Sequence, residues 1–125
     1  MDIAKLKKKI DSENARMNGD LEYTFKYKGY TSKIVRVAVY GHLCGYIKLN
    51  SNVSDREYEV IDKVAHGGIT WIDNQWVCFN YFHTGDFSLW GYEKSRCSKK
   101  DVYRDFDYVK ENIKSVIDAL EENYK

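Results

Sequence analysis

The stretch SKKDVYRDFDYVKENIKSVIDAL, residues 98–120, carries the clearest structural signal in the chain. Its apolar residues recur every three to four positions, and most residues between them are charged. This spacing places the apolar side chains on one face of a long α-helix. Ser98 followed by Asp101 matches a capping box and predicts where the helix begins. The expected apolar stripe consists of Val102, Phe106, Val109, Ile113, Val116, Ile117 and Leu120.

Two segments upstream alternate between apolar and polar residues, as half-buried strands do. The first, residues 21–28, has an aromatic residue at every second position from 23 to 27. The second, residues 33–49, keeps its apolar residues in step across Gly41, and a single residue is too short for a hairpin turn. We therefore predict one long strand over 33–49, bent at Gly41 or Gly45.

A hairpin is predicted further along the chain. Residues 68–72 and 76–82 are rich in aromatic and β-branched residues, and the Asp-Asn-Gln turn at 73–75 tolerates the positive φ of a tight hairpin. Two polar stretches, residues 50–64 and 84–97, lack clean periodicity. We expect both to be loops, the first with one helical turn.

An N-terminal helix over residues 2–17 completes the expected fold, with Asn18-Gly19 as its stop signal. This order of elements predicts an α+β protein. Its antiparallel sheet has about four to five strands, with the N-terminal helix and the long C-terminal helix packed on one face. The chain has 125 residues and no linker-like segment, so we expect a single domain over residues 1–125.

The composition argues against several classes of protein. No run of about 18 apolar residues is present to span a membrane, and no apolar signal-peptide segment follows the N-terminal lysines. The formal net charge of +1 argues against bulk nucleic acid as a partner. Cys44, Cys78 and Cys97 are an odd, widely spaced set. Three reduced thiols in a cytoplasmic protein explain them more simply than one disulfide with a leftover thiol.

All three histidines lie within two residues of a glycine, at a predicted strand end or bend. Glycine there lets a backbone or a ligand approach closely, and imidazole can donate, accept or bind a metal. His42, His66 and His83 are therefore expected to share one site. Because His83 is in phase with the apolar residues of its strand, it can join the site only if that strand ends or bulges near Phe82.

Binding of a small phosphorylated ligand fits these residues best. Adjacent N–H groups at Gly67 and Gly68 could form an anion-binding nest, arginine contacts phosphate, and aromatic rings stack on nucleobases. No cofactor is predicted. The residues expected to bind the ligand are Arg36, His42, Tyr46, His66, Gly67, Gly68, His83, Asp86 and Trp90.

Two other kinds of site were weighed against ligand binding. The histidines with Asp86 offer donors for zinc or iron, but no pair has the spacing that marks a metal site, and no metal is predicted. Cys44 lies two residues from His42, and His83 with Asp86 offers an oriented base. No catalytic signature accompanies them. The sequence favours a binding protein over an enzyme.

Four motifs lie within roughly residues 35–115. They are GHLCGY at 41–46, HGGIT at 66–70, FNYFHTGD at 79–86 and DFDYV at 105–109. Together they resemble a family of small proteins encoded by bacteriophages and prophages, which has no established activity. The loop at 50–64 is shorter than the family pattern.

This resemblance implies a phage origin and a role in the cytoplasm of the infected bacterial host. Together with the predicted site, it favours an inhibitor of antiviral defence that binds and sequesters a small nucleotide-type signalling molecule. A protein-binding inhibitor of a host defence nuclease, of the anti-CRISPR type, is one alternative. A small hydrolase or transferase using His42, His66 and His83 is another. A homo-oligomer with pockets at a subunit interface is compatible with sequestration.

Overall fold

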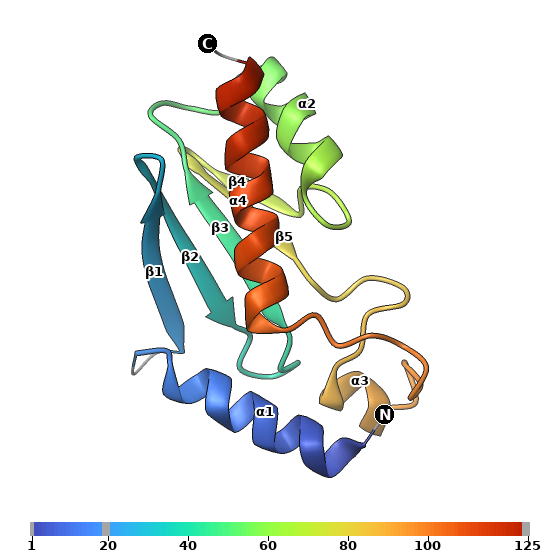
Figure 1. The fold of residues 1–125 in the computed structure, drawn as a ribbon. Helices are drawn as coiled ribbons and strands as arrows, with labels where there is room; N and C mark the ends of the chain where they lie inside the picture. The colour runs from blue at the N-terminus through green and yellow to red at the C-terminus, as the bar shows by residue number, and fades with distance from the viewer. Residues whose placement is uncertain (1, 19–20, 124–125) are drawn as a thin grey trace.

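In the computed structural model, which describes residues 2–18 and 21–123, the centre of the fold is an antiparallel sheet (Figure 1). Its five strands lie in the order β1-β2-β3-β5-β4. This confirms the predicted α+β fold; Gly19 of the expected helix stop lies outside the described residues. The strands are β1 (Glu22–Tyr27), β2 (Tyr30–Arg36), β3 (Leu43–Lys48), β4 (Trp71–Asp73) and β5 (Trp76–Asn80).

Helices cover one face and one end of this sheet. The longest, α4, lies across the face, with α2 beside it, and α1 crosses the end at which β1 begins and β2 ends (Figure 1). The short α3 follows the loop after β5. The helices of the described residues are α1 (Ile3–Ala15), α2 (Asp55–Val64), α3 (Leu89–Glu93) and α4 (Phe106–Asn123).

The core lies between α4 and the sheet. Six of the seven residues in the predicted stripe, from Phe106 to Leu120, are buried on α4. Opposite them, β3 has a glycine: a Cβ at Gly45 would lie 2.9 Å from the Phe79 ring and 3.1 Å from Ile113. The missing side chain therefore lets α4 approach the sheet closely.

The predicted start of the C-terminal helix is wrong. Ser98 and Asp101 form a separate turn, in which the Ser98 N–H donates to the Asp101 carboxylate at 2.9 Å. The helix begins at Phe106, and Asp105 caps it by accepting from the Tyr108 N–H at 2.8 Å. Val102, expected on the stripe, is 49% exposed because it lies in the preceding segment.

The prediction of one long strand over 33–49 is also wrong. β2 and β3 are antiparallel neighbours joined by a loop over residues 37–42, in which Gly41 has a φ of +78°. Ile34 faces the core, whereas the half-buried Val35 faces the other side of the sheet, paired with Cys44. Both faces of β2 carry apolar residues. The alternating pattern therefore placed Val35 on the core face and gave no sign of the turn between β2 and β3.

The two segments expected to be loops both contain helix. α2 replaces the expected loop at 50–64, and its start is a complete capping box between Ser54 and Glu57. α3 lies within the expected loop at 84–97, capped by Ser88. The predicted hairpin is confirmed, because Asp73 pairs with Trp76 across a two-residue turn.

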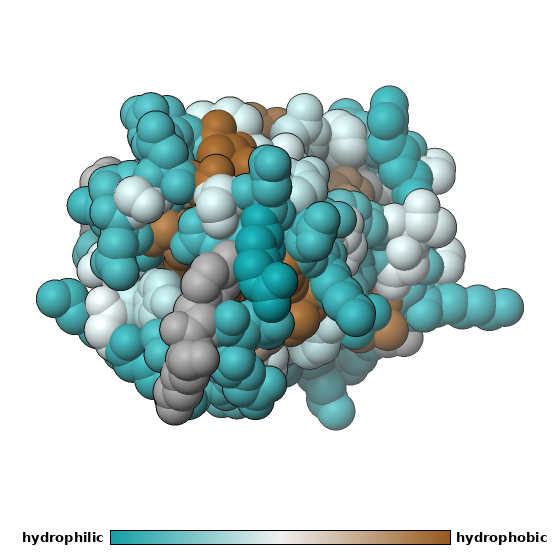
Figure 2. All heavy atoms as spheres, turned by 90° about the horizontal axis from the view of Figure 1, so that it is seen from above, coloured by the Kyte–Doolittle hydropathy of each residue, from teal (hydrophilic) through white to brown (hydrophobic). Residues whose placement is uncertain are grey.

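The surface away from the core is largely polar. Figure 2 views the molecule from the end at which α4 finishes, where most of the surface is hydrophilic and hydrophobic residues form separate patches. Among the helices of the described residues, none is both long and apolar enough to cross a membrane.

A buried ion pair joins α1 to the sheet and to α4. Arg36, at the end of β2, lies 3.0 Å from the Glu13 carboxylate, and the two residues are 6% and 4% exposed. Glu13 also accepts from the Phe106 N–H at 2.6 Å, and Arg36 also donates to the Gly41 carbonyl at 3.0 Å. The pair therefore connects α1, the end of β2, the loop after it and the start of α4.

Replacing Arg36 with Met should reduce the free energy of unfolding by about 3–5 kcal/mol, because it leaves the Glu13 charge buried without its partner. Urea unfolding measures this loss. Lys28→Met is the matched control, since Lys28 forms an exposed ion pair with Asp118 at 2.7 Å and surface pairs contribute little. Equal effects of the two substitutions would contradict the assigned role of the buried pair.

Candidate functional site

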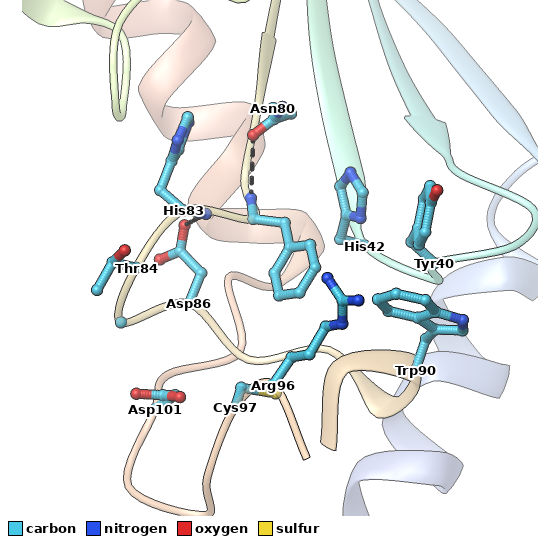
Figure 3. A pocket seen from close by; sticks show the side chains of 12 residues that line it. Tyr40, His42, Asn80, His83, Thr84, Asp86, Trp90, Arg96, Cys97 and Asp101 are labelled. Atoms are coloured by element: carbon cyan, nitrogen blue, oxygen red, sulfur yellow. Dashed lines mark hydrogen bonds between the residues drawn. The ribbon is translucent and has the colours of Figure 1, made fainter. Parts of the chain in front are cut away.

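A cavity of about 700 Å³ lies between the β2–β3 loop and the segments that follow β5 (Figure 3). Tyr40 and His42 come from the β2–β3 loop. Asn80 ends β5, residues 82–86 follow it, and Trp90 and Arg96 come from α3 and the loop after it. The cavity thus collects loops from one end of the sheet, where loop residues can contact a ligand without disturbing the strands.

One wall of the cavity is aromatic. The rings of Tyr40 and Trp90 meet edge to face with centroids 4.6 Å apart. On the other side of Tyr40, His42 lies 6.1 Å away with its ring nearly parallel, and Phe82 lies 5.2 Å from His42. Four flat rings from three separate segments therefore line one region.

His42 is the buried polar group of this wall. It is 7% exposed, and its Nδ1 has no hydrogen-bond partner within residues 2–18 and 21–123. Burial, helped by the nearby His83 and Arg36, lowers the pKa of His42 from 6.5 to about 4. His42 is therefore neutral near pH 7, with one ring nitrogen donating and the other accepting.

Arg96 supplies an uncommitted positive charge at the cavity. Its guanidinium lies 5.4 Å from the centre of the Trp90 ring, a cation–π contact. Within the part of the chain that the structure describes, the Arg96 side chain has no carboxylate or hydrogen-bond partner. A guanidinium in this state can bind a phosphate through two parallel hydrogen bonds.

His83 lies across the end of β5 from His42 (Figure 3). β5 ends at Asn80, so the condition for His83 to leave the strand's alternation is met. Its ring packs against Gly67, where a Cβ would lie 2.2 Å from His83 Cδ2, and its buried Nε2 has no hydrogen-bond partner among the described residues. Gly67 is thus required for the position of the His83 ring.

Asp86 connects His83 and His66. It is 2% exposed, and its carboxylate accepts from the His83 backbone N–H at 2.8 Å and lies 2.8 Å from His66 Nε2. Arg104 Nε also donates to it at 2.8 Å. Burial raises the pKa of Asp86, but the bonds from Arg104, His83 and His66 outweigh burial and hold it below its usual range. Asp86 is therefore a buried carboxylate that stays ionised.

The structure brings some of the predicted ligand-binding residues together and separates others. His42, His83, Asp86 and Trp90 line the cavity, and His66 adjoins it, with its ring centroid 5.9 Å from that of His83. Tyr46 lies on the opposite face of the sheet from α4, beside Trp76 at 6.4 Å.

Two further predicted residues have internal partners. Arg36 uses its donors within the buried pair described above. The Gly68 N–H donates to the Ala65 carbonyl at 2.9 Å, in the turn that follows α2. This N–H is therefore not free to form an anion-binding nest with Gly67. The two glycines instead have φ of +71° and +85°, which the tight turn after α2 requires.

Two residues of this region escaped the sequence analysis. Arg104, in the segment that leads into α4, reaches Asp86, and Tyr108, in the first turn of α4, reaches His66. They lie about 20 and 40 residues away along the chain, and nothing in their spacing marked them.

Within the described ranges, no group of three or more His, Cys, Asp or Glu side chains is arranged to hold a metal.

Comparison with known proteins finds no family model, curated protein or solved structure that matches this chain. The resemblance to the phage-encoded family therefore stays a prediction.

Gly67→Ala should displace the His83 ring and destabilise the fold by about 2–4 kcal/mol, from the backbone strain of a positive φ and the clash with His83. Gly85→Ala is the control, since Gly85 also has a positive φ of +94° but no atom within 4 Å of a Cβ. It should cost only about 1–2 kcal/mol of strain. Urea unfolding of the two variants measures the difference, and equal losses would show that the contact with His83 is unimportant.

Acidification should destabilise the protein through His42. Between its folded pKa of about 4 and its ordinary value of 6.5, the unfolded chain binds a proton that the folded chain does not. Stability should therefore fall as the pH is lowered through this window, by up to roughly 3 kcal/mol. Urea unfolding at pH 7.5 and pH 4.5 tests this. His42→Phe should lose clearly less stability over the same range; an equal loss would contradict the assignment.

Proposed function

We propose that the chain binds a small nucleotide-type ligand in the cavity between the β2–β3 loop and α3. The observation that carries the proposal is the buried, unpartnered Nδ1 of His42 in the cavity wall. A buried polar atom without a partner costs about 1–3 kcal/mol, so such atoms in native proteins are usually satisfied by protein, water or ligand. A polar atom of the ligand at this position removes that cost.

The aromatic wall suits a nucleobase. Tyr40 and Trp90 come from different segments and hold each other edge to face, so each ring is fixed before a ligand arrives. Stacking on such a ring contributes about 1–3 kcal/mol per base and needs no particular base sequence. His42 beside them offers a neutral donor or acceptor to the edge of the base.

The charges at the cavity suit the rest of a nucleotide. Arg96 can bind a phosphate, and Asp101, which also lines the cavity, can accept a hydrogen bond from a sugar hydroxyl. The charge of Asp86 is already balanced by Arg104, so it repels a phosphate less than a free carboxylate would.

The resemblance to phage-encoded proteins extends this proposal to a biological role. In an infected cell, a protein that holds such a ligand without changing it would remove a nucleotide signal on which antiviral defence depends. We propose this sequestration as the role of the cavity.

A panel of cyclic mononucleotides, cyclic dinucleotides and cyclic ADP-ribose isomers tests the proposal, with thermal shift as the first measurement and calorimetry for affinity. Trp90→Ala and Arg96→Met should each weaken binding about 10–100-fold through lost stacking or lost phosphate contacts. Trp71→Ala is the control, because Trp71 is 52% exposed on β4 and does not line the cavity.

The fate of the ligand separates the candidate roles. Ligand released intact by heating supports sequestration, and ligand released in altered form contradicts it. If no member of the panel shifts the melting temperature, nucleotide binding is wrong, and a protein-binding inhibitor becomes the better hypothesis.

A further inference from the structure

A second group of polar side chains runs from the buried Asp86 to the surface, away from the aromatic wall. Asp86 lies 2.8 Å from His66 Nε2, and the Tyr108 hydroxyl lies 2.9 Å from His66 Nδ1. Asp86 is 2% exposed and Tyr108 is 38% exposed. The three residues thus form a hydrogen-bonded chain from a buried carboxylate, through an imidazole, to an accessible hydroxyl.

The direction of each hydrogen bond in this chain follows from the chemistry of its ends. Asp86 is ionised and can only accept, so His66 Nε2 must carry a proton and donate it. In neutral His66 the other nitrogen, Nδ1, then has a free lone pair and accepts from the Tyr108 hydroxyl. His66 is therefore placed to take the proton of Tyr108, while Asp86 stabilises the imidazolium that results.

The His66 ring is held in this orientation from several sides. It stacks on Tyr81 with centroids 5.3 Å apart and an angle of 13° between the rings. Its backbone N–H donates to the Asn112 side-chain oxygen at 2.9 Å, and the Tyr81 hydroxyl donates to the same oxygen at 2.8 Å. Such support fixes a catalytic group in its reactive geometry before substrate binds.

Arg104 places a positive charge over the ring of Tyr108. Its Nε donates to Asp86, and its guanidinium carbon lies 5.0 Å from the centre of the Tyr108 ring. Within residues 2–18 and 21–123, its two terminal nitrogens have no hydrogen-bond partner. These donors can hold the oxygens of a phosphoryl group next to Tyr108 and stabilise the charge that develops there.

We propose that Tyr108 and His66 are catalytic residues that hydrolyse phosphate esters through a phosphotyrosine, with Asp86 as a positioning residue. His66 takes the hydroxyl proton as the Tyr108 oxygen bonds to phosphorus, and the bond from phosphorus to the leaving oxygen breaks. His66 then gives that proton to the leaving oxygen. In the second step His66 takes a proton from water, which attacks phosphorus, and the released Tyr108 oxygen recovers the proton from His66. Of these residues only Asp86 lines the cavity, so the two reacting side chains, Tyr108 and His66, lie outside it.

Hydrolysis of 4-nitrophenyl phosphate and bis(4-nitrophenyl) phosphate by the purified chain tests this proposal. Tyr108→Phe and His66→Gln should each lower the rate of nitrophenolate release by at least about 100-fold. Tyr58→Phe is the matched control, since Tyr58 is 42% exposed on α2 and should leave the rate unchanged. Mass spectrometry after acid quenching should find the phosphoryl group on Tyr108.

The proposal is overturned if nitrophenolate release does not exceed that of Tyr108→Phe, if the phosphoryl group is on another residue, or if only 4-nitrophenyl acetate is cleaved. Nitration with tetranitromethane gives a readout that needs no substrate, because the reagent reacts with tyrosinate. Tyr108 should react faster than Tyr58 in the wild type, and the difference should disappear in His66→Gln. Equal rates in the wild type would contradict proton transfer to His66. Thermal unfolding confirms that each variant is folded.

Discussion

The buried pair of Glu13 and Arg36 is the constraint on which the candidate site depends. Burying two charges lowers the stability of the fold by several kcal/mol unless the charges pair with each other and with surrounding dipoles in good geometry. Glu13 meets this requirement by accepting from Arg36, Tyr103 and the Phe106 N–H. Arg36 meets it by donating to Glu13, Asn14, Tyr103 and the Gly41 carbonyl. Each of these bonds fixes a segment that borders the site.

Two of these hydrogen bonds affect where the functional residues lie. The bond to the Gly41 carbonyl fixes the loop that carries Tyr40 and His42 into the aromatic wall. The bond to the Phe106 N–H satisfies one of the free donors at the start of α4, and so sets where the helix begins. Asp86 then acts as a second centre, which joins the segment after β5 to His66 and Arg104. The two buried carboxylates thus help to position the loop of Tyr40 and His42, and the side chains of His66 and Arg104.

The sequence predicted the elements whose patterns are local. The stripe on α4, the alternation of β1 and the turn of the β4–β5 hairpin depend on near neighbours, and each was found. The hairpin between β2 and β3 was missed because Val35 is apolar on the outer face, so alternation did not reveal the change of direction. α2 was missed although Ser54 and Glu57 form the same capping pattern that was read, wrongly, at Ser98 and Asp101. A capping motif marks a helix only when the chain beyond it can bury an apolar face.

The candidate site shows the same difference between local patterns, which the sequence reveals, and long-range contacts, which it does not. Of the glycines beside the histidines, Gly67 admits the His83 ring, whereas Gly41 and Gly85 have no atom within 4 Å of an added Cβ. None of them could show that Arg36 would be used internally. That outcome depends on Glu13, 23 residues away, and on Tyr103, 67 residues away.

Net charge was a poor guide for a related reason. The formal charge of +1 counts arginines that already have partners within the fold. Arg36 and Arg104 bind Glu13 and Asp86, Arg16 lies 3.5 Å from Asp107, and Arg56 lies 3.5 Å from Asn123. Arg96 is the arginine whose side chain has neither kind of partner in the described part of the chain, and it lies at the aromatic cavity. A nearly neutral protein can therefore still offer one such guanidinium to a small anion, because a ligand responds to the local potential and not to the sum over the chain.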